Sequence, residues 1–427
     1  MQKNNPSSFI LHPSSFRLDS HGEFDELTRF SFAGDRPFAV LKAWENRIEW
    51  ITANGVEQWI GDPFEALRDI LNRYTVTDMA SGPPLRHGGM IGYLGYELKS
   101  WIEQVSSRAV KDLNIPDLWF GCYQDISTRP HSVVSSGLQP SALRDMNPVK
   151  PLCCPHSNYT RQNYLDAVQK IKAYILSGDV YQVNLAQRLS MPWPGSPEAL
   201  YAQLCRINPA PFSAYLNAGN FQVLSISPER YLQYVPDTRR VETRPIKGTR
   251  PRGRTETEDA NQAEALRQSA KDQAEHLMIV DLERNDLGRV CETGSVQVTR
   301  LNHLNAHPTV WHLVSTVEGH LREDCDRIDL LRATFPGGSI TGAPKIRAMD
   351  IIDELEPTTR GVYTGAIGYL GFDGSMDLNI AIRTLILKDR TAYFHVGGGI
   401  VADSDPEAEY EETMDKARAI IWALSNK

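Results

Sequence analysis

The sequence is poor in the features that mark several protein classes. Its 427 residues include six cysteines, but none forms a C-x-x-C pair and no zinc-like spacing occurs. This excludes a cysteine-based zinc module and a thioredoxin-type redox pair. No apolar run approaches the roughly 20 residues that cross a bilayer, and the N-terminus lacks the apolar core of a secretory signal. We therefore expect a cytoplasmic protein without a membrane segment.

Positively charged residues are not in excess either. The formal net charge is -8, with 45 Lys and Arg residues against 53 Asp and Glu residues. Because neutralising nucleic-acid phosphates requires clustered positive charge, this balance argues against a nucleic-acid binder.

Nucleotide-binding loops are missing as well. The stretch FPGGSITGAPK runs from glycines into a predicted helix, but no Gly-Lys-Ser/Thr follows, so it is not a Walker loop. The segment HVGGGIV follows a predicted strand and does not match G-x-G-x-x-G. Both segments suit either backbone amides that bind a carboxylate or simple tight turns.

Composition divides the chain into four regions. Residues 1–18 repeat Pro-Ser-Ser-Phe and predict a disordered leader, or a start codon placed too early. Residues 19–126 mix strand-like and helical segments. Residues 127–158 are rich in Pro, Ser and Asn without a sustained period, which is typical of a linker or a long surface loop. Residues 159–427 are the predicted catalytic domain.

The pattern of this last region predicts an α+β fold. From Tyr159 apolar residues recur at helical spacing until Gly178, which supplies a stop. Alternation from Tyr181 predicts a strand, and further strands are expected at FQVLSIS, TGAIGYLGF, LNIAIRTLIL and AYFHVGGGIV. Helices are expected at EALRQSAKDQAEHLMIVDLERND and EAEYEETMDKARAIIWAL. Because strands cluster instead of alternating with helices, large antiparallel sheets are favoured over a doubly wound fold.

Two of the predicted helices each carry a pair of carboxylates three residues apart. Asp272 and Glu275 share one helix face, and Glu409 and Glu412 repeat the spacing near the C-terminus. If the two faces met, they could hold Mg²⁺, which binds a few carboxylates together with water and an anionic substrate. The same spacing occurs on ordinary solvated helix faces, which are more common.

A basic stretch, RPIKGTRPRGR, places Lys247 among four arginines. Its prolines and glycines predict a shaped loop instead of a helix. Neighbouring cations disfavour a protonated amine, so Lys247 could act as a nucleophile. The alternative is a plain anion-binding loop, in which arginines capture a carboxylate or phosphate and Lys247 is one more charge.

Together and in this order, the segments resemble one family. The blocks GDVYQVNLAQR, SPERY, RPIKGTRPRG, AEHLMIVDLERNDLGRVC, FPGGSITGAPK, NIAIRT and GGGIVADSDPEAEYEET are similar to those of the chorismate-utilising enzymes. That family includes component I of anthranilate synthase and of aminodeoxychorismate synthase, and the isochorismate and salicylate synthases. The resemblance implies an α+β fold of two large antiparallel β-sheets packed face to face, with outer helices and the active site between the sheets.

The resemblance also assigns binding residues. Glu275 and Glu412 match the family's magnesium-binding glutamates, with Asp272 and Glu409 as acidic partners behind them. Chorismate and Mg²⁺ are therefore the implied substrate and cofactor. The residues that match groups holding the carboxylates of chorismate, or lining its pocket, are Tyr363, Arg383, Lys416, Gly399, Thr341 and Gly342.

Four further residues carry the implied chemistry. Glu229 in SPERY matches the family's general acid/base near the ring hydroxyl, and His312 matches a histidine near the departing groups. Gln182 stands where water-adding relatives have lysine, and because an amide cannot act as a base, it points to ammonia as the nucleophile. Lys247 stands where anthranilate synthases usually have alanine and many aminodeoxychorismate synthases have lysine. The implied mechanism is covalent: Lys247 attacks C2 of chorismate as the C4 hydroxyl leaves, and ammonia then attacks C4.

The resemblance thus implies an aminodeoxychorismate synthase component I, and three alternatives stand beside it. Anthranilate synthase component I shares every matched residue except Lys247. A non-catalytic chorismate-binding regulatory subunit is disfavoured by the joint presence of Glu229, Glu275, His312, Lys247 and Glu412. A basic nucleic-acid module is disfavoured by the overall charge.

An ammonia source is implied outside this chain. The sequence contains no Gly-x-Cys-x-Gly elbow of a glutaminase, so the resemblance implies a separate glutamine amidotransferase subunit. Feedback-inhibited anthranilate synthases bind tryptophan through a Leu-Leu-Glu-Ser segment. Its expected counterpart here is Leu41-Lys42-Ala43-Trp44, which lacks Glu and Ser, and this disfavours inhibition by tryptophan.

Overall fold

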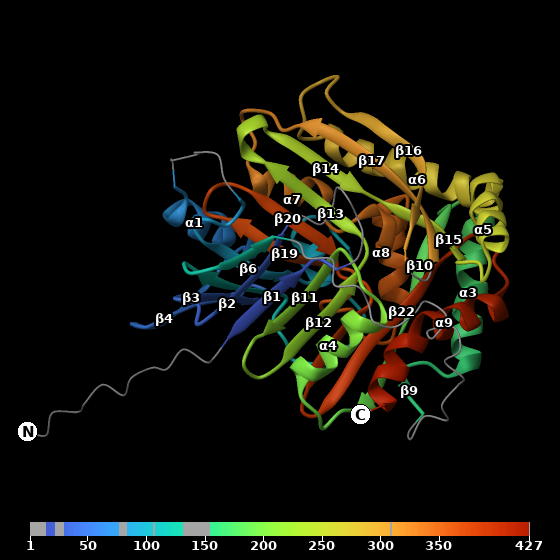
Figure 1. Cartoon of the computed structure of the whole chain (residues 1–427), viewed down its shortest axis with the longest axis horizontal. Helices are drawn as coiled ribbons and strands as arrows, with labels where there is room; N and C mark the ends of the chain where they lie inside the picture. The colour runs from blue at the N-terminus through green and yellow to red at the C-terminus, as the bar shows by residue number, and fades with distance from the viewer. Residues whose placement is uncertain are drawn as a thin grey trace, which may run out of the picture.

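Two antiparallel β-sheets form the centre of the protein, which we describe from a computed structural model (Figure 1). The structure describes residues 14–21, 30–76, 83–105, 107–130, 154–307 and 310–426. Within these ranges, one sheet has 10 strands and the other has 12. The predicted α+β class, with two large antiparallel sheets packed face to face and helices outside, is confirmed.

The first sheet consists, in spatial order, of β18 (Gly342–Ala343), β10 (Gln182–Pro192), β22 (Thr391–Ile400), β21 (Thr384–Lys388), β12 (Gln222–Ser227), β11 (Phe212–Asn217), β1 (Ser15–Asp19), β2 (Phe30–Asp35) and β8 (Ser127–Pro130), with β9 (His156–Ser157) paired to β10.

The second sheet consists, in spatial order, of β15 (Ile246–Pro251), β17 (Val310–His320), β14 (Arg240–Arg244), β13 (Arg230–Val235), β20 (Met376–Ile380), β19 (Ala366–Gly371), β6 (Gly89–Leu94), β7 (Leu118–Tyr123), β3 (Ala39–Trp44), β4 (Arg47–Thr52) and β5 (Gly55–Ile60), with β16 (Gln297–Ala306) paired to β17.

The described helices are α1 (Pro63–Tyr74), α3 (Arg161–Leu176), α4 (Pro197–Ile207), α5 (Glu256–Gln268), α6 (Ala270–Gly288), α7 (Arg327–Thr334), α8 (Lys345–Leu355) and α9 (Pro406–Ser425), with 3₁₀ turns η1 (Tyr96–Trp101), η2 (Pro236–Thr238) and η3 (Gly338–Ile340). None of them combines the length and apolar character that a membrane span requires.

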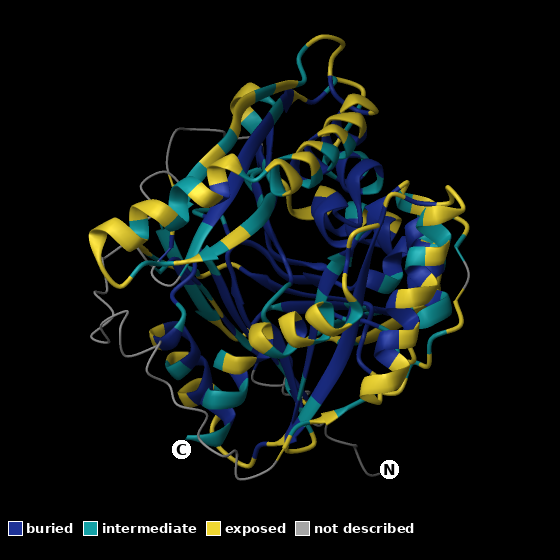
Figure 2. Ribbon diagram, turned by 90° about the vertical axis from the view of Figure 1, so that its right-hand side faces the viewer, coloured by how far each residue is buried: buried dark blue, intermediate teal, exposed yellow. Residues whose placement is uncertain are grey.

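Apolar side chains from both sheets meet in a common buried layer. Phe16 of β1, Trp119 of β7 and Val223 of β12 belong to one cluster. Helices α1, α6 and α7 cover the outer face of the second sheet, and α4 and α9 cover that of the first. Helices α3 and α8 pack against β10. Figure 2 shows the result: buried strands fill the interior, and the helices expose only their outer faces.

The predicted division between residues 19–126 and 159–427 is wrong, because both regions share both sheets. Strand β6 pairs with β19, and β1 pairs with β11. Antiparallel pairing across the boundary joins the two regions into one core. The N-terminal segment is therefore part of the scaffold that carries the catalytic residues.

The predicted leader extends too far. Residues 1–13 lie outside the described residues, but Ser15–Asp19 forms a strand between β2 and β11. Phe16 is 1% exposed and its ring centroid lies 4.6 Å from that of Tyr123. Burial of this aromatic ring stabilises a segment whose composition alone predicts disorder.

The predicted linker at residues 127–158 is also wrong at both ends. Strand β8 pairs with β2, and β9 pairs with β10. Residues 131–153 lie outside the described residues. Strands this short contain too few residues to show a period of two, so pattern analysis missed them.

Two long predicted elements are each divided in the structure. The helix predicted over residues 264–286 breaks at Ser269, whose side chain caps α6 by accepting a hydrogen bond from the Asp272 amide. The single strand predicted at LNIAIRTLIL becomes β20 in the second sheet and β21 in the first. Arg383, with φ 49°, lies where the chain passes between the sheets. This crossing brings Arg383 to the site described next.

Candidate active site

A cavity of about 190 Å³ is bounded by strands of both sheets. Strands β10 and β22 contribute residues from the first sheet, and β15 contributes residues from the second. Strand β21 pairs with β22 only as far as Phe394, and beyond it residues 395–400 pair with β10 alone among the described strands. Six predicted site residues line the cavity: Glu229, Lys247, His312, Tyr363, Arg383 and Lys416.

Lys247 lies on a strand, which corrects the prediction of a loop. Strand β15 pairs with β17 alone among the described strands, and such edge positions tolerate proline. The register shifts between Lys247 and Thr249, at Gly248 with φ 70°. A bulge of this kind changes the direction of neighbouring side chains. Both Lys247 and Thr249 consequently line the cavity.

Burial favours loss of the proton from Lys247. Its Nζ donates a 2.9 Å hydrogen bond to the carbonyl oxygen of Ser339 and forms no ion pair among the described residues. Burial lowers the pKa of Lys247; Glu229 opposes this change, and Lys416 adds to it. The amine is therefore easier to deprotonate than an exposed lysine.

The neighbouring arginines do not cause this shift, contrary to the expectation from sequence. Each forms an ion pair with a carboxylate: the pairs are Arg244–Glu242, Arg250–Asp272, Arg252–Asp259 and Arg254–Glu258. Glu242 is shared with Arg230 and Arg240. Paired charges of opposite sign largely cancel at a distance. The basic stretch thus holds the strand to its surroundings, and Lys247 alone of its cations lines the cavity.

Glu229 is the buried acid of the cavity and is 4% exposed. Its Oε1 accepts a long hydrogen bond, 3.4 Å, from the backbone nitrogen of Ile246. Burial raises the pKa of Glu229 from 4.5 to about 7, although the Ser339 hydroxyl and Lys247 act in the opposite direction. A carboxyl group with this pKa can both donate and accept a proton near neutral pH.

His312 is a neutral imidazole on β17. Burial, assisted by the charge of Arg383, lowers its pKa to about 3. Its Nδ1 lies 3.3 Å from the carbonyl oxygen of Gly248 and 3.1 Å from Oγ1 of Thr249. Because a carbonyl oxygen only accepts, the ring proton is assigned to Nδ1. Nε2 is buried without a partner among the described residues, so it remains a hydrogen-bond acceptor.

Arg383 and Tyr363 supply groups suited to a carboxylate. No ion pair to the Arg383 guanidinium exists among the described residues, and burial lowers its pKa while Glu229 raises it. Tyr363 stacks on His395, with ring centroids 4.9 Å apart and planes at 11°. Burial raises the pKa of Tyr363 to about 12, so its hydroxyl stays a donor. A guanidinium and a hydroxyl of this kind bind carboxylate oxygens strongly when desolvated.

Gln182, Gly342 and Gly399 do not line the cavity and instead lie against one another where β10, β18 and β22 meet. A Cβ at Gly399 would lie 1.9 Å from Nε2 of Gln182, so this glycine leaves room for the amide. A Cβ at Gly342, where φ is 144°, would lie 2.1 Å from the backbone oxygen of Gln182. Thr341 is fully buried, and its hydroxyl donates to the carbonyl oxygen of Gly337 at 3.0 Å. Its side chain therefore holds the turn and does not line the cavity.

On α6, the two predicted acidic residues differ in their surroundings. Asp272 forms a 2.7 Å ion pair with Arg250. Glu275 has a weaker contact, 3.9 Å, with Lys271. Burial raises the pKa of Glu275, and the charge of Glu412 contributes to the same shift. The carboxylates of α6 and α9 are thus close enough to repel each other.

On α9, Glu412 and Glu409 converge near β22. A Cβ at Gly398 would lie 3.3 Å from Oε2 of Glu409 and 3.5 Å from Oε1 of Glu412. Glu412 forms a 2.7 Å ion pair with Lys416, which outweighs burial and keeps its pKa below the usual value. Glu409 accepts a 2.6 Å hydrogen bond from the Ser404 hydroxyl.

This donor set fits magnesium. No group of three or more His, Cys, Asp or Glu side chains in the described ranges has metal-binding geometry. Magnesium does not require one, because one or two protein carboxylates suffice when water and substrate oxygens complete its shell. Mutual repulsion between Glu275 and Glu412 is the property that a divalent cation would relieve.

Sequence reasoning missed four polar residues of the cavity: Asn184, Thr249, Ser339 and His395. Asn184 could have been found, because it lies two residues after Gln182 on a predicted strand and therefore on the same face. The direction of the other side chains depends on the bulge in β15, on η3 and on the free edge of β22. Residue patterns do not encode these features.

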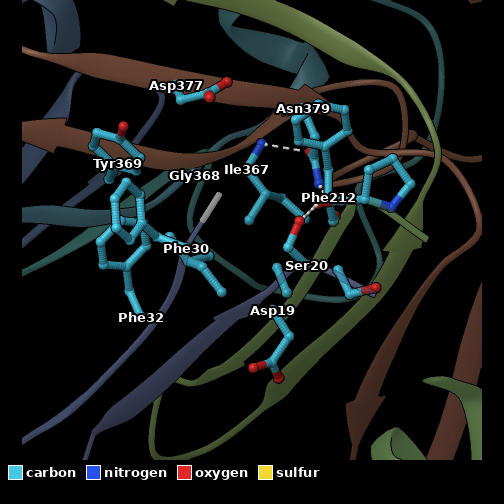
Figure 3. Close-up of a pocket in the computed structure, with 14 residues that line it drawn as sticks. Asp19, Ser20, Phe30, Phe32, Phe212, Ile367, Gly368, Tyr369, Asp377 and Asn379 are labelled. Atoms are coloured by element: carbon cyan, nitrogen blue, oxygen red, sulfur yellow. Dashed lines mark hydrogen bonds between the residues drawn. The ribbon is translucent and has the colours of Figure 1, made fainter. Parts of the chain in front are cut away.

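A second, smaller cavity of about 70 Å³ lies between the sheets. Figure 3 shows Phe30, Phe32 and Tyr369 gathered on one side, with Asp19 and Ser20 apart from them. The segment Leu41–Trp44, predicted as the counterpart of a tryptophan-binding sequence, belongs to β3 and does not line this cavity. Leu41 instead packs in the cluster beneath α1.

Comparisons with known proteins show the family to which the chain belongs. A family model described as chorismate binding enzyme matches residues 28–421. Aminodeoxychorismate synthase component 1 of Klebsiella aerogenes is 45% identical over 434 residues, covering 99% of this chain and 94% of the relative. Anthranilate synthase component 1 of Thermus thermophilus is 39% identical, covering 96% and 92%. The crystal structure of anthranilate synthase component I from Streptococcus pneumoniae superposes with a TM-score of 0.78 at 32% identity, covering 99% and 96%.

Proposed function

The chain belongs to the chorismate-binding enzyme family and is a chorismate-utilising enzyme of the aminodeoxychorismate or anthranilate synthase component I type; we propose the first of these reactions for it. It would convert chorismate and ammonia to 4-amino-4-deoxychorismate, the precursor of 4-aminobenzoate in folate synthesis. The observation that carries the proposal is the amine of the half-buried Lys247, which lines the same cavity as the protonatable Glu229.

In the first step, the neutral amine of Lys247 forms a bond to C2 of chorismate, both ring double bonds shift by one position, and the C4–O bond breaks; the two double bonds shift back in the second step. Glu229 gives its proton to the departing oxygen, which leaves as water. In the second step, ammonia forms a bond to C4, and the bond between C2 and Lys247 breaks with its electron pair returning to the lysine. One proton of the new ammonium group passes to the Glu229 carboxylate, which restores the starting state.

The remaining residues hold the substrate. Arg383 and Tyr363 suit one carboxylate of chorismate, and Lys416 lies beside the cavity for the other. His312, neutral and with an unpartnered Nε2, would accept a hydrogen bond near the ring hydroxyl.

Glu275 and Glu412 would hold Mg²⁺, with Asp272 and Glu409 behind them. When bound, the ion supplies positive charge that orients and neutralises a substrate carboxylate. The chain's own contribution is two carboxylates on separate helices, neither of which lines the cavity itself.

Ammonia would come from a separate glutamine amidotransferase subunit. The sequence carries no glutaminase nucleophile elbow, so this chain alone would use only free ammonia. We expect negligible turnover with glutamine, restored by an amidotransferase subunit or by an ammonium salt at high pH.

Product analysis tests the proposed reaction. Purified protein with chorismate, Mg²⁺ and an ammonium salt should yield 4-amino-4-deoxychorismate and no pyruvate. Anthranilate with stoichiometric pyruvate would contradict the proposal and assign the chain to the anthranilate branch, to which several relatives belong.

A further inference from the structure

One polar side chain in the cavity has no hydrogen bond to explain its position. Asn184 of β10 is 9% exposed and lines the cavity beside Glu229 and Lys247. Its Oδ1 is buried without a partner, and neither end of its amide is bonded to another described residue. Buried polar groups are almost always satisfied, so an exception at an active site indicates a ligand.

The backbone of Asn184, in contrast, is held firmly. Its amide donates to the carbonyl oxygen of Thr341 at 2.8 Å, and its own carbonyl oxygen accepts from Nη2 of Arg360 at 2.8 Å. Arg360 is 1% exposed and is paired with Glu356. The strand therefore presents the Asn184 side chain from a rigid position, which is the arrangement expected of a binding group.

A second unsatisfied amide lies on the same face of β10. Gln182, two residues earlier, is 2% exposed, and its Oε1 also lacks a partner among the described residues. The residue paired with Asn184 on β22 is Gly399, and a Cβ there would lie 1.9 Å from Nε2 of Gln182. The Gln182 amide therefore packs over this glycine, on the same face of β10 as the carboxamide of Asn184.

The other groups of the cavity have their own parts in the proposed reaction. Arg383 and Lys416 are cations that suit carboxylates. Lys247 is the nucleophile, and Nε2 of His312 accepts a hydrogen bond near the ring hydroxyl. Ammonia offers three N–H donors and needs an acceptor to aim its lone pair at carbon. A charged carboxylate would favour ammonium, which is not a nucleophile, whereas a neutral carbonyl oxygen binds ammonia without stabilising the extra proton.

We propose that Asn184 binds the attacking ammonia, with its carboxamide oxygen accepting an N–H hydrogen bond and Gln182 offering a second acceptor. Rotation of the Asn184 carboxamide by half a turn exchanges its oxygen and nitrogen atoms. Because neither atom is hydrogen-bonded to a described residue, the side chain can turn its oxygen toward ammonia. The inference rests on the proposed use of ammonia by this site and names the residue that receives it.

A pair of variants of similar shape tests the inference. Asn184→Val removes the acceptor, whereas Asn184→Thr retains an oxygen in a side chain of nearly the same volume. Asn184→Val should raise the KM for ammonia roughly 2- to 10-fold, the cost of one uncharged hydrogen bond, and leave the KM for chorismate unchanged. Asn184→Thr should recover part of the loss. Formation of the Lys247 adduct without ammonia should proceed at the wild-type rate in both.

Gln187→Leu is a matched control on the same strand. Its amide is fully bonded, to Ser157 at 2.7 Å and to Thr413 at 2.6 Å, so the substitution should lower the melting temperature and leave both KM values unchanged. An unaltered KM for ammonia in Asn184→Val would overturn the inference, as would a rise in the KM for chorismate or slower adduct formation. If the proposed function itself is wrong, the wild-type protein would instead form anthranilate and pyruvate in place of 4-amino-4-deoxychorismate.

Discussion

Lys247 and Ser339 are joined by a 2.9 Å hydrogen bond from the lysine Nζ to the backbone carbonyl oxygen. A neutral carbonyl group orients the amine without fixing its proton as a carboxylate would. Together with burial, which lowers the pKa of Lys247, this contact leaves an amine that is aimed and easily deprotonated. The nucleophile thus depends on a turn, η3, that is distant from it in sequence.

The pKa of Glu229 predicts an alkaline limb in the pH profile of the first step. Because this pKa is raised to about 7, adduct formation should fall as the pH rises through about 7 and Glu229 loses its proton. Glu229→Gln should slow adduct formation by about 10²- to 10⁴-fold, the usual contribution of a general acid, and remove the inflection. The measurement is the single-turnover rate of adduct formation against pH. An unchanged inflection in Glu229→Gln would assign it to another group.

The same shift affects stability. The folded protein holds a proton on Glu229 between pH 4.5 and about 7, where the unfolded chain does not. This contribution is present below pH 4.5 and is lost as the pH rises through about 7. Glu229→Gln should therefore show a smaller loss of unfolding free energy between pH 5 and 8 than the wild type, measured by urea denaturation.

Glu275 and Glu412 should be essential for turnover. Glu275→Gln and Glu412→Gln should each reduce kcat by more than the roughly 10- to 100-fold cost of losing a residue behind a metal ligand. Melting temperatures should stay near the wild-type value. Glu411→Gln, on the exposed surface of the same helix, is the matched control and should leave kcat unchanged. Activity that survives chelation with EDTA would contradict magnesium dependence.

Two glycines should respond differently to the same substitution. Gly342→Ala places a Cβ 2.1 Å from a backbone oxygen at φ 144°, so the fold must yield, at a cost of at least about 1–3 kcal/mol. Gly399→Ala meets only the flexible end of Gln182, so it should be milder in stability and more harmful to ammonia-dependent turnover. Thermal melting of Gly399→Ala, with and without Gln182→Ala, would show non-additivity if the two residues interact as described.

Much of this site could be predicted from sequence because its residues lie in distinctive blocks. The segments around Glu229, Lys247 and Arg383 resemble family motifs, and all three line one cavity. The cause of the Lys247 pKa shift could not be predicted, since nothing in RPIKGTRPRGR shows that each arginine forms an ion pair with a carboxylate. Those partners come from β14, α5 and α6, and only the fold brings them together.

The fold was predictable in class but not in connectivity. Alternating and helical periods indicate strands and helices one at a time, and clustering of strands indicates antiparallel sheets. The pairing of β1 with β11 joins residues about 200 positions apart, which no local pattern specifies. Local sequence patterns also missed β8 and β9, because strands of so few residues show no period of two.

The covalent role of Lys247 is the central claim, and intact-mass spectrometry tests it most directly. With chorismate and Mg²⁺ but no ammonia, the wild-type protein should gain the mass of chorismate minus water, and peptide mapping should place it on Lys247. Lys247→Ala should carry no adduct and should lose 4-amino-4-deoxychorismate formation by several orders of magnitude. A wild-type protein without adduct, together with a Lys247→Ala variant that makes the same product at a similar rate, would contradict the account.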